Sequence, residues 1–166
     1  MASIFYETIF FDIRPRPMTT HKLAPHVDAI AIDMLAHGQL RYPIVFVQAS
    51  NNSFNFYECD SRLDAAECLL EMQRGSFTGL CGYIGVASMI VLDSGTPVEC
   101  VTIEIMGLVQ DTVHRVREVR RDTSTNDILG GGACFSVIYP SSESAIVRMR
   151  DAMTSMCFLP IPASCL

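Results

Sequence analysis

The residues best placed to do chemistry lie at one junction, Glu58-Cys59-Asp60-Ser61-Arg62. A strand-like apolar run precedes this junction and a helix-like pattern follows it. A helix start offers free backbone N–H groups and a positive dipole end, which together bind anions. Arg62 could then clamp a phosphate, Asp60 could orient a metal or act as a base, and Cys59 could be a low-pKa nucleophile. The structural alternative is that Asp60 or Ser61 caps the helix, Arg62 pairs with a nearby carboxylate and Cys59 packs in the core.

A second cluster is basic: Arg115, Arg117, Arg120 and Arg121 supply four of the twelve cations of the chain. Such a cluster could form a basic interaction edge that contacts nucleic acid or an acidic partner. No aromatic residues interleave with the arginines, which weakens the case for stacking on single-stranded bases. A solvated, charged sheet edge that blocks strand-to-strand pairing explains the cluster equally well.

Other candidate motifs predict no chemistry. The run Gly130-Gly131-Gly132 precedes a strand-like segment, whereas phosphate loops precede a helix, so a flexible turn is expected. The four histidines show neither HxH nor HExxH spacing, which predicts no metal site. No GxSxG motif is present, and no catalytic residue is assigned.

Composition limits the class of protein. The chain has 166 residues, 49% of them hydrophobic and only 18% charged, which leaves room for a partner-covered surface. The net charge of −6 argues against general polyanion binding, and no apolar run is long enough to predict a membrane span. The N-terminus does not resemble a signal peptide. Seven cysteines without a CxxC pair indicate free thiols in a reducing, cytoplasmic compartment.

Two elements must position the junction, and a helix precedes them. Residues 3–13 are typical of a strand, and 21–37 have the apolar spacing of a helix capped by Thr19 or Thr20. Pro25 is expected in the first turn of that helix. Strands are predicted at 43–49 and 53–58, joined by a hairpin turn. A helix then follows from Ser61 to Arg74, with Ser61 and Asp64 forming a capping box.

The second half is richer in strands. Residues 82–92 and 97–109 are predicted to form an antiparallel hairpin. Residues 110–121 have valines that suit either a helix face or a strand, and a strand is favoured. A loop is expected at 122–132, a strand at 133–139, and a last helix that begins after Ser141 or Ser142.

The order of these elements resembles the ParB/sulfiredoxin superfamily over about residues 9–75. The similar features are Ile13-Arg14-Pro15, a helix that ends at Gly38, the strand starting at Pro43, and the helix-opening box at 59–66, CDSRLDAA. The resemblance implies nucleotide phosphate binding with magnesium, with Arg62 as the phosphate-contacting arginine and Asp60 at the acidic or cysteine position. Where the family has a glycine in the box, this chain has Cys59, whose side chain would hinder close approach of phosphates.

Taken together, the sequence predicts one α+β domain over residues 1–166, with a mixed sheet flanked by about three helices. The favoured function is a non-catalytic interaction or assembly protein on a ParB/sulfiredoxin-like scaffold, which self-associates or binds a protein partner. The alternative is a nucleotide- or phosphate-binding protein, or a nucleotide-dependent enzyme, that uses Asp60, Ser61 and Arg62.

Overall fold

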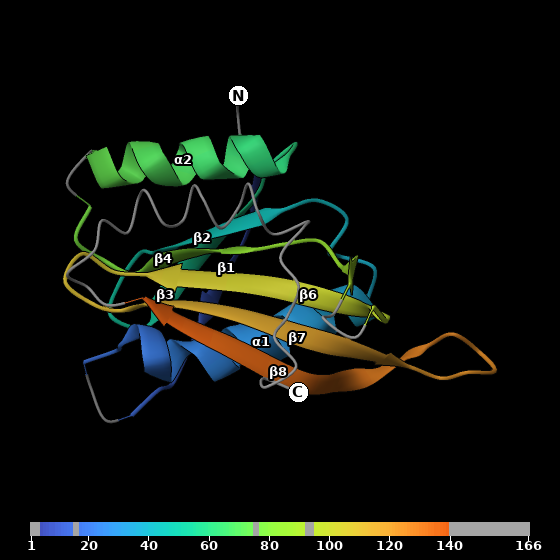
Figure 1. The fold of residues 1–166 in the computed structure, drawn as a ribbon. Coiled ribbons are helices and arrows are strands. Elements are labelled where there is room, and N and C mark those ends of the chain that lie inside the picture. The colour runs from blue at the N-terminus through green and yellow to red at the C-terminus, as the bar shows by residue number, and fades with distance from the viewer. Residues whose placement is uncertain (1–3, 15–16, 75–76, 92–94, 140–166) are drawn as a thin grey trace.

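The computed structural model describes residues 4–14, 17–74, 77–91 and 95–139. This part of the chain contains two helices and one eight-stranded sheet (Figure 1). The elements in chain order are β1 (Ile4–Phe10), α1 (Thr20–Ala36), β2 (Ile44–Gln48), β3 (Ser53–Glu58), α2 (Arg62–Arg74), β4 (Cys81–Ile84), β5 (Ser88–Val91), β6 (Pro97–Met106), β7 (Thr112–Arg121) and β8 (Ile128–Tyr139).

The sheet runs in the order β1-β3-β2-β4-β6-β7-β8, and β5 pairs with one end of β6. The α+β class is therefore confirmed. The expectation of a mixed sheet is wrong, because every pairing among the described strands is antiparallel. Successive strands are linked largely by short turns, and short turns enforce antiparallel neighbours. The helix expected after Ser141 lies outside the described residues.

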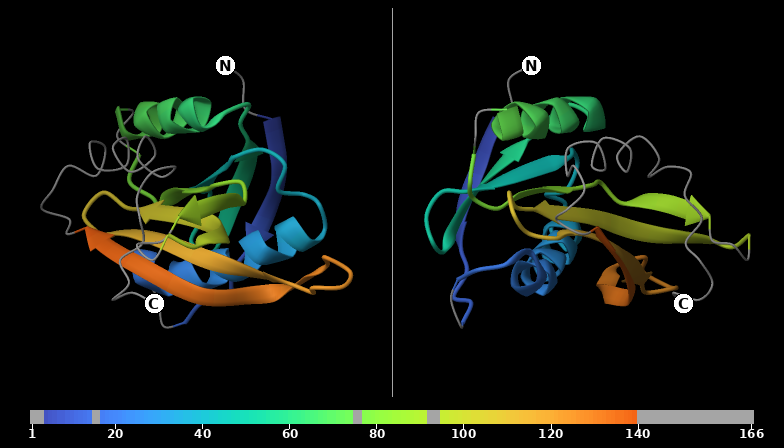
Figure 2. Two further views of the ribbon diagram at one scale, coloured as in Figure 1. Left: turned by 45° about the vertical axis from the view of Figure 1, so that its right-hand side comes forward. Right: turned by 60° about the vertical axis from the view of Figure 1, so that its left-hand side comes forward.

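The two helices cover opposite faces of the sheet (Figures 1 and 2). Helix α1 packs on β6, β7 and β8, whereas α2 packs on β2 and β4. Alternation along the strands divides the core accordingly, with Phe46 and Ile105 in the cluster under α1 and Val45 and Met106 in the cluster under α2. The sheet twists strongly, so that β1 and β8 run in very different directions (Figure 2).

Helix α1 has the predicted N-cap but starts further from Pro25 than predicted. The Thr19 hydroxyl accepts a hydrogen bond from the Lys22 backbone N–H at 3.2 Å, which confirms the N-cap. Pro25 was expected in the first turn, yet it lies inside the helix, which already starts at Thr20. The helix ends at Ala36 with His37 as its C-cap, and Gly38 follows with a φ of +68°, which suits glycine.

The predicted strand over residues 82–92 is divided into β4 and β5. Gly85 lies at the end of β4, where an added Cβ would collide with the Thr102 hydroxyl. The two strands pair with different parts of β6, whose Cys100 and Ile103 lie opposite Ser88 and Ile84. The ambiguous segment 110–121 forms strand β7, as favoured.

The expected loop at 122–132 is wrong for its last five residues, because β8 already begins at Ile128. Gly131 and Gly132 belong to the strand and do not form a turn. A Cβ on Gly131 would lie 2.8 Å from Cδ of Arg117, and one on Gly132 would lie 2.7 Å from a carboxylate oxygen of Glu118. The glycines thus leave room for long side chains of β7 to lie across β8.

The sequence predicts free cysteines and no membrane-spanning segment. The described cysteines, including Cys59, Cys100 and Cys134, are free thiols, while Cys157 and Cys165 lie outside the described residues. Among the described residues, neither helix has the length and hydropathy needed to cross a membrane.

Candidate functional site

The predicted junction is built as a helix cap. Ser61 Oγ accepts the Asp64 backbone N–H at 3.1 Å and lies 2.8 Å from the Asp64 carboxylate, which it donates to. The Ser61 side chain therefore satisfies one of the free backbone N–H groups at the N-terminus of α2. Asp60 is exposed, and Arg62 begins the helix with a half-buried side chain. Phosphate binding by Asp60, Ser61 and Arg62 stays a prediction.

Cys59 belongs to the core and not to an open site. Its side chain is 3% exposed and packs in the cluster under α2. Burial, together with the smaller effects of the neighbouring Cys68, Asp64 and Asp60, raises the pKa of the Cys59 thiol to about 11. The interpretation of Cys59 as a low-pKa nucleophile is therefore wrong, since a raised pKa keeps the thiol protonated near neutral pH.

The basic cluster becomes strand β7, whose alternation separates its arginines. Arg115 and Arg117 project toward α1, where both bind the same carboxylate. Arg121 binds Glu99 through two hydrogen bonds of 2.6 and 2.9 Å, and this hydrogen bonding raises the pKa of Arg121. Arg120 is exposed. Carboxylates within the chain thus engage three of the four arginines that were predicted to form an interaction edge.

The carboxylate shared by the two arginines is that of Asp28 on α1. Its Oδ2 lies 2.6 Å from Nη2 of Arg115 and 2.9 Å from Nη2 of Arg117. Asp28 is only 3% exposed, so both ion pairs form largely away from water. The pairs tie α1 to the middle of β7, over a separation of 89 residues in sequence for Asp28 and Arg117.

Strand β8 joins the same cluster, which we call the Asp28 cluster (Asp28, Arg115, Arg117 and Cys134). Arg115 donates to Sγ of Cys134 from Nε and Nη2, at 3.3 and 3.1 Å. Arg117 donates from Nη1 to the backbone oxygen of Gly132 at 2.8 Å. Helix α1 and the β7–β8 hairpin, which are distant in sequence, are therefore joined by one polar cluster inside the fold.

A second polar pair lies on the opposite face of the β6–β7 hairpin. Glu104 and His114 are register partners, and Nδ1 of His114 lies 2.8 Å from Oε1 of Glu104. Carboxylate–imidazole pairs of this kind orient histidine in acid–base catalysis. Here Glu104 is fully buried and His114 is 8% exposed, so the pair presents little surface to a substrate. The pair links β6 to β7 across the hairpin.

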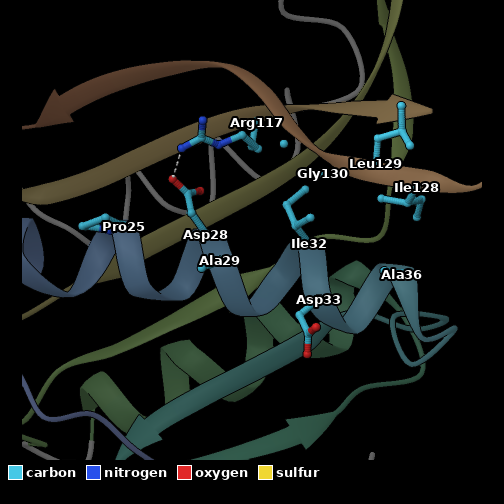
Figure 3. A pocket seen from close by; sticks show the side chains of 11 residues that line it. Pro25, Asp28, Ala29, Ile32, Asp33, Ala36, Arg117, Ile128, Leu129 and Gly130 are labelled. Carbon is cyan, nitrogen blue, oxygen red and sulfur yellow. Dashed lines mark hydrogen bonds and ion pairs between the residues drawn. The ribbon is translucent and has the colours of Figure 1, made fainter. Parts of the chain in front are cut away.

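A shallow groove of about 470 Å³ adjoins the Asp28 cluster (Figure 3). It lies between α1 and the first residues of β8, and Arg117 forms part of its wall. Within the described ranges, no group of three or more His, Cys, Asp or Glu side chains is placed to hold a metal ion.

Among the described residues, the sheet has two outermost strands at the ends of its strand order. Strand β8 is one edge and β1 is the other, and no described strand pairs with the outer side of either. The twelve residues of β8 include no charged side chain and no proline. Leu129, Val137 and Ile138 on β8 are 68%, 46% and 43% exposed. Such an edge is a template for pairing with another strand.

Sequence reasoning missed Asp28 and the β8 edge. The signal for Asp28 was present, because an acidic residue between Val27 and Ala31 on the apolar face of α1 needs a buried partner. The edge position of β8 follows only from the strand order, which the sequence does not display.

Comparisons with protein-family models, with curated proteins and with solved structures found no match to this chain.

Proposed function

We propose that this chain is a non-catalytic assembly protein that self-associates by pairing the outer edge of β8 with β8 of a second copy. One observation carries the proposal: β8 is a twelve-residue edge strand without a single charged residue. Natural proteins protect long edge strands with charges, prolines or bulges. An edge left without charges along its whole length is best explained by a partner.

The other edge of the sheet provides the contrast. Strand β1 has seven residues, carries Glu7, and has a register irregularity between Phe5 and Glu7. Both features discourage pairing with a further strand. Strand β8 has irregular pairing only toward its start, and residues 134–139 pair continuously with β7. The regular half of β8 is therefore the segment most suited to receive another strand.

Self-pairing of β8 gives a closed dimer. Two antiparallel copies related by a two-fold axis use the same surface, so that one contact satisfies both. Like charges that face each other across paired strands are destabilising. Because β8 has no charged residue, its self-pairing carries no such penalty despite the net charge of −6 of the chain.

The order of elements before Gly75 supports a ParB/sulfiredoxin-like origin for the scaffold. Strand β1, helix α1 followed by Gly38, strands β2 and β3, and helix α2 follow one another as the resemblance implies. In this proposal the scaffold serves assembly, since the helix start where related proteins would hold phosphate is capped by Ser61 and Asp64.

The test is the mass of the purified chain in solution, measured by light scattering during gel filtration. The wild type is expected to have twice the monomer mass of 18.3 kDa. Val137→Lys places a charge on the exposed edge strand and is expected to give the monomer. Val109→Lys is the matched control, because Val109 is 81% exposed in the β6–β7 turn and should leave the dimer intact.

A wild type that stays at the monomer mass at all concentrations would contradict self-association. Equal masses for Val137→Lys and the wild type would place any interface elsewhere. Masses that keep rising with concentration would indicate head-to-tail pairing of β8 with β1, since heterologous contacts need not close, and would overturn the two-fold dimer.

A further inference from the structure

The groove beside the Asp28 cluster combines an apolar wall with one cationic group. The close-up shows it bounded by one side of α1 and by the start of β8 (Figure 3). Six lining residues are apolar: Pro25, Ala29, Ile32, Ala36, Ile128 and Leu129. Its volume of about 470 Å³ falls in the range of small-molecule sites.

The cationic group is the guanidinium of Arg117. Its Nη2 is held by Asp28 and its Nη1 by the Gly132 carbonyl, so the group is fixed in orientation. A guanidinium has five N–H donors, and these two bonds use only part of them. The side chain is 23% exposed and lines the groove. Remaining donors of a pre-oriented Arg117 can therefore meet a ligand.

The charge balance around this group favours an anion. Two guanidiniums, of Arg115 and Arg117, share one carboxylate, which leaves an excess of one positive charge. Oδ1 of Asp28 is enclosed and does not face a ligand. The other acidic residue of the wall is Asp33, whose carboxylate points away from Arg117 (Figure 3) and lies 3.4 Å from His37.

The glycines of β8 allow close approach. Gly130 and Gly131 line the groove opposite α1. A Cβ on Gly130 would meet no atom within 4 Å, so the groove is open there, whereas Arg117 takes the space beside Gly131. The aliphatic part of a ligand could therefore lie along the β8 backbone against Ile32 and Leu129. Both are apolar, and Leu129 is 68% exposed, so covering it would be favourable.

We infer that this groove binds a small monocarboxylate with an apolar tail, its carboxylate on Arg117 and its tail between α1 and residues 128–131. A planar carboxylate matches the guanidinium fork. A single negative charge on the ligand matches the excess of one positive charge in the cluster. A phosphate dianion would instead leave a surplus negative charge beside Asp28. This inference does not depend on assembly through β8.

The probe is sodium hexanoate, titrated into the full-length, ¹⁵N-labelled protein and followed by amide shifts. Saturable shifts are expected at Ile32, Ala36, Leu129 and Gly131. Hexan-1-ol has the same tail without the charge, and acetate has the charge without the tail. Hexan-1-ol and acetate are each expected to bind at least about tenfold more weakly than hexanoate, because each lacks either the charged or the apolar contact.

Two variants separate the charge from the apolar wall. Arg117→Gln should weaken hexanoate about tenfold and leave hexan-1-ol unchanged. Ala29→Phe fills the groove from an exposed position on α1, so it should fold normally and abolish binding of both probes. Absence of saturable shifts with hexanoate would overturn the inference. Equal binding of hexanoate and hexan-1-ol, or full binding to Ala29→Phe, would overturn it as well.

Discussion

Removal of the Asp28 carboxylate should cost more stability than any surface substitution on α1. The carboxylate receives charged hydrogen bonds from Arg115 and Arg117 at 2.6 and 2.9 Å and is 3% exposed. Each such bond contributes about 1.5–3 kcal/mol. The arginine side chains are 17% and 23% exposed, so water can partly solvate them once the carboxylate is gone. We therefore expect Asp28→Asn to lower the free energy of unfolding by about 3 kcal/mol.

Substitutions of Arg115 and Arg117 should have strongly non-additive effects on the free energy of unfolding. Arg115→Met or Arg117→Met alone leaves Asp28 with one guanidinium and should cost about 1.5 kcal/mol each. The double variant leaves a buried carboxylate without a cation and should cost about 5 kcal/mol, which implies a coupling of about 2 kcal/mol.

The assay is urea unfolding followed by circular dichroism, with the slope checked for two-state behaviour. Asp33→Asn is the matched control, because Asp33 lies on the same helix with a side chain that is 71% exposed. It should change stability by less than about 0.5 kcal/mol. Additive arginine variants, or an Asp28→Asn variant as stable as Asp33→Asn, would refute the buried-cluster reasoning.

Four other predictions test the rest of the structure. Burial raises the pKa of Cys59 and of Cys100 to about 11, so both thiols should resist iodoacetamide at pH 8 in the folded protein, and rapid labelling would contradict their placement. Stability should fall as the pH rises from about 9 toward about 11, because the unfolded thiols ionise first. Gly82→Ala should lower the free energy of unfolding by about 3 kcal/mol, because the new methyl group meets Phe46 and the Glu104 backbone. Gly95→Ala has open space around it and should lower the free energy of unfolding by about 1 kcal/mol, because Gly95 has a positive φ. Equal losses for the two variants would contradict the packing of β4. If the helix start binds nucleotide, ATP, CTP or ADP with magnesium should raise the melting temperature and Arg62→Ala should remove the shift, while no shift in the wild type excludes that alternative.

Local structure was largely readable from the sequence. The Thr19 cap, the Ser61–Asp64 capping box and the strands β2 and β3 depend on residues close in sequence, and all were placed within a residue or two. Strand β8 was only half recognised, because glycines favour a turn unless a neighbouring strand needs the space they leave. That need arises from Arg117 and Glu118 on β7.

The polar clusters were not readable in the same way. The arginines of β7 were visible as a basic segment, but their partner Asp28 lies 89 residues away from Arg117 and meets it only through tertiary packing. The junction at Cys59 shows the opposite case, because its sequence predicts a reactive thiol that the fold does not provide. Its residues are adjacent in sequence, yet the fold buries the thiol and uses Ser61 and Asp64 as a cap.

Hydrogen exchange of the backbone tests pairing of the β8 edge. Those amides of residues 134–138 that point away from β7 should exchange slowly at high protein concentration and faster after dilution below the dissociation constant, while β1 amides should not respond. Val137→Lys should exchange quickly at every concentration. Exchange of these outward-pointing amides that is independent of concentration and equal in the wild type and Val137→Lys would contradict assembly through β8.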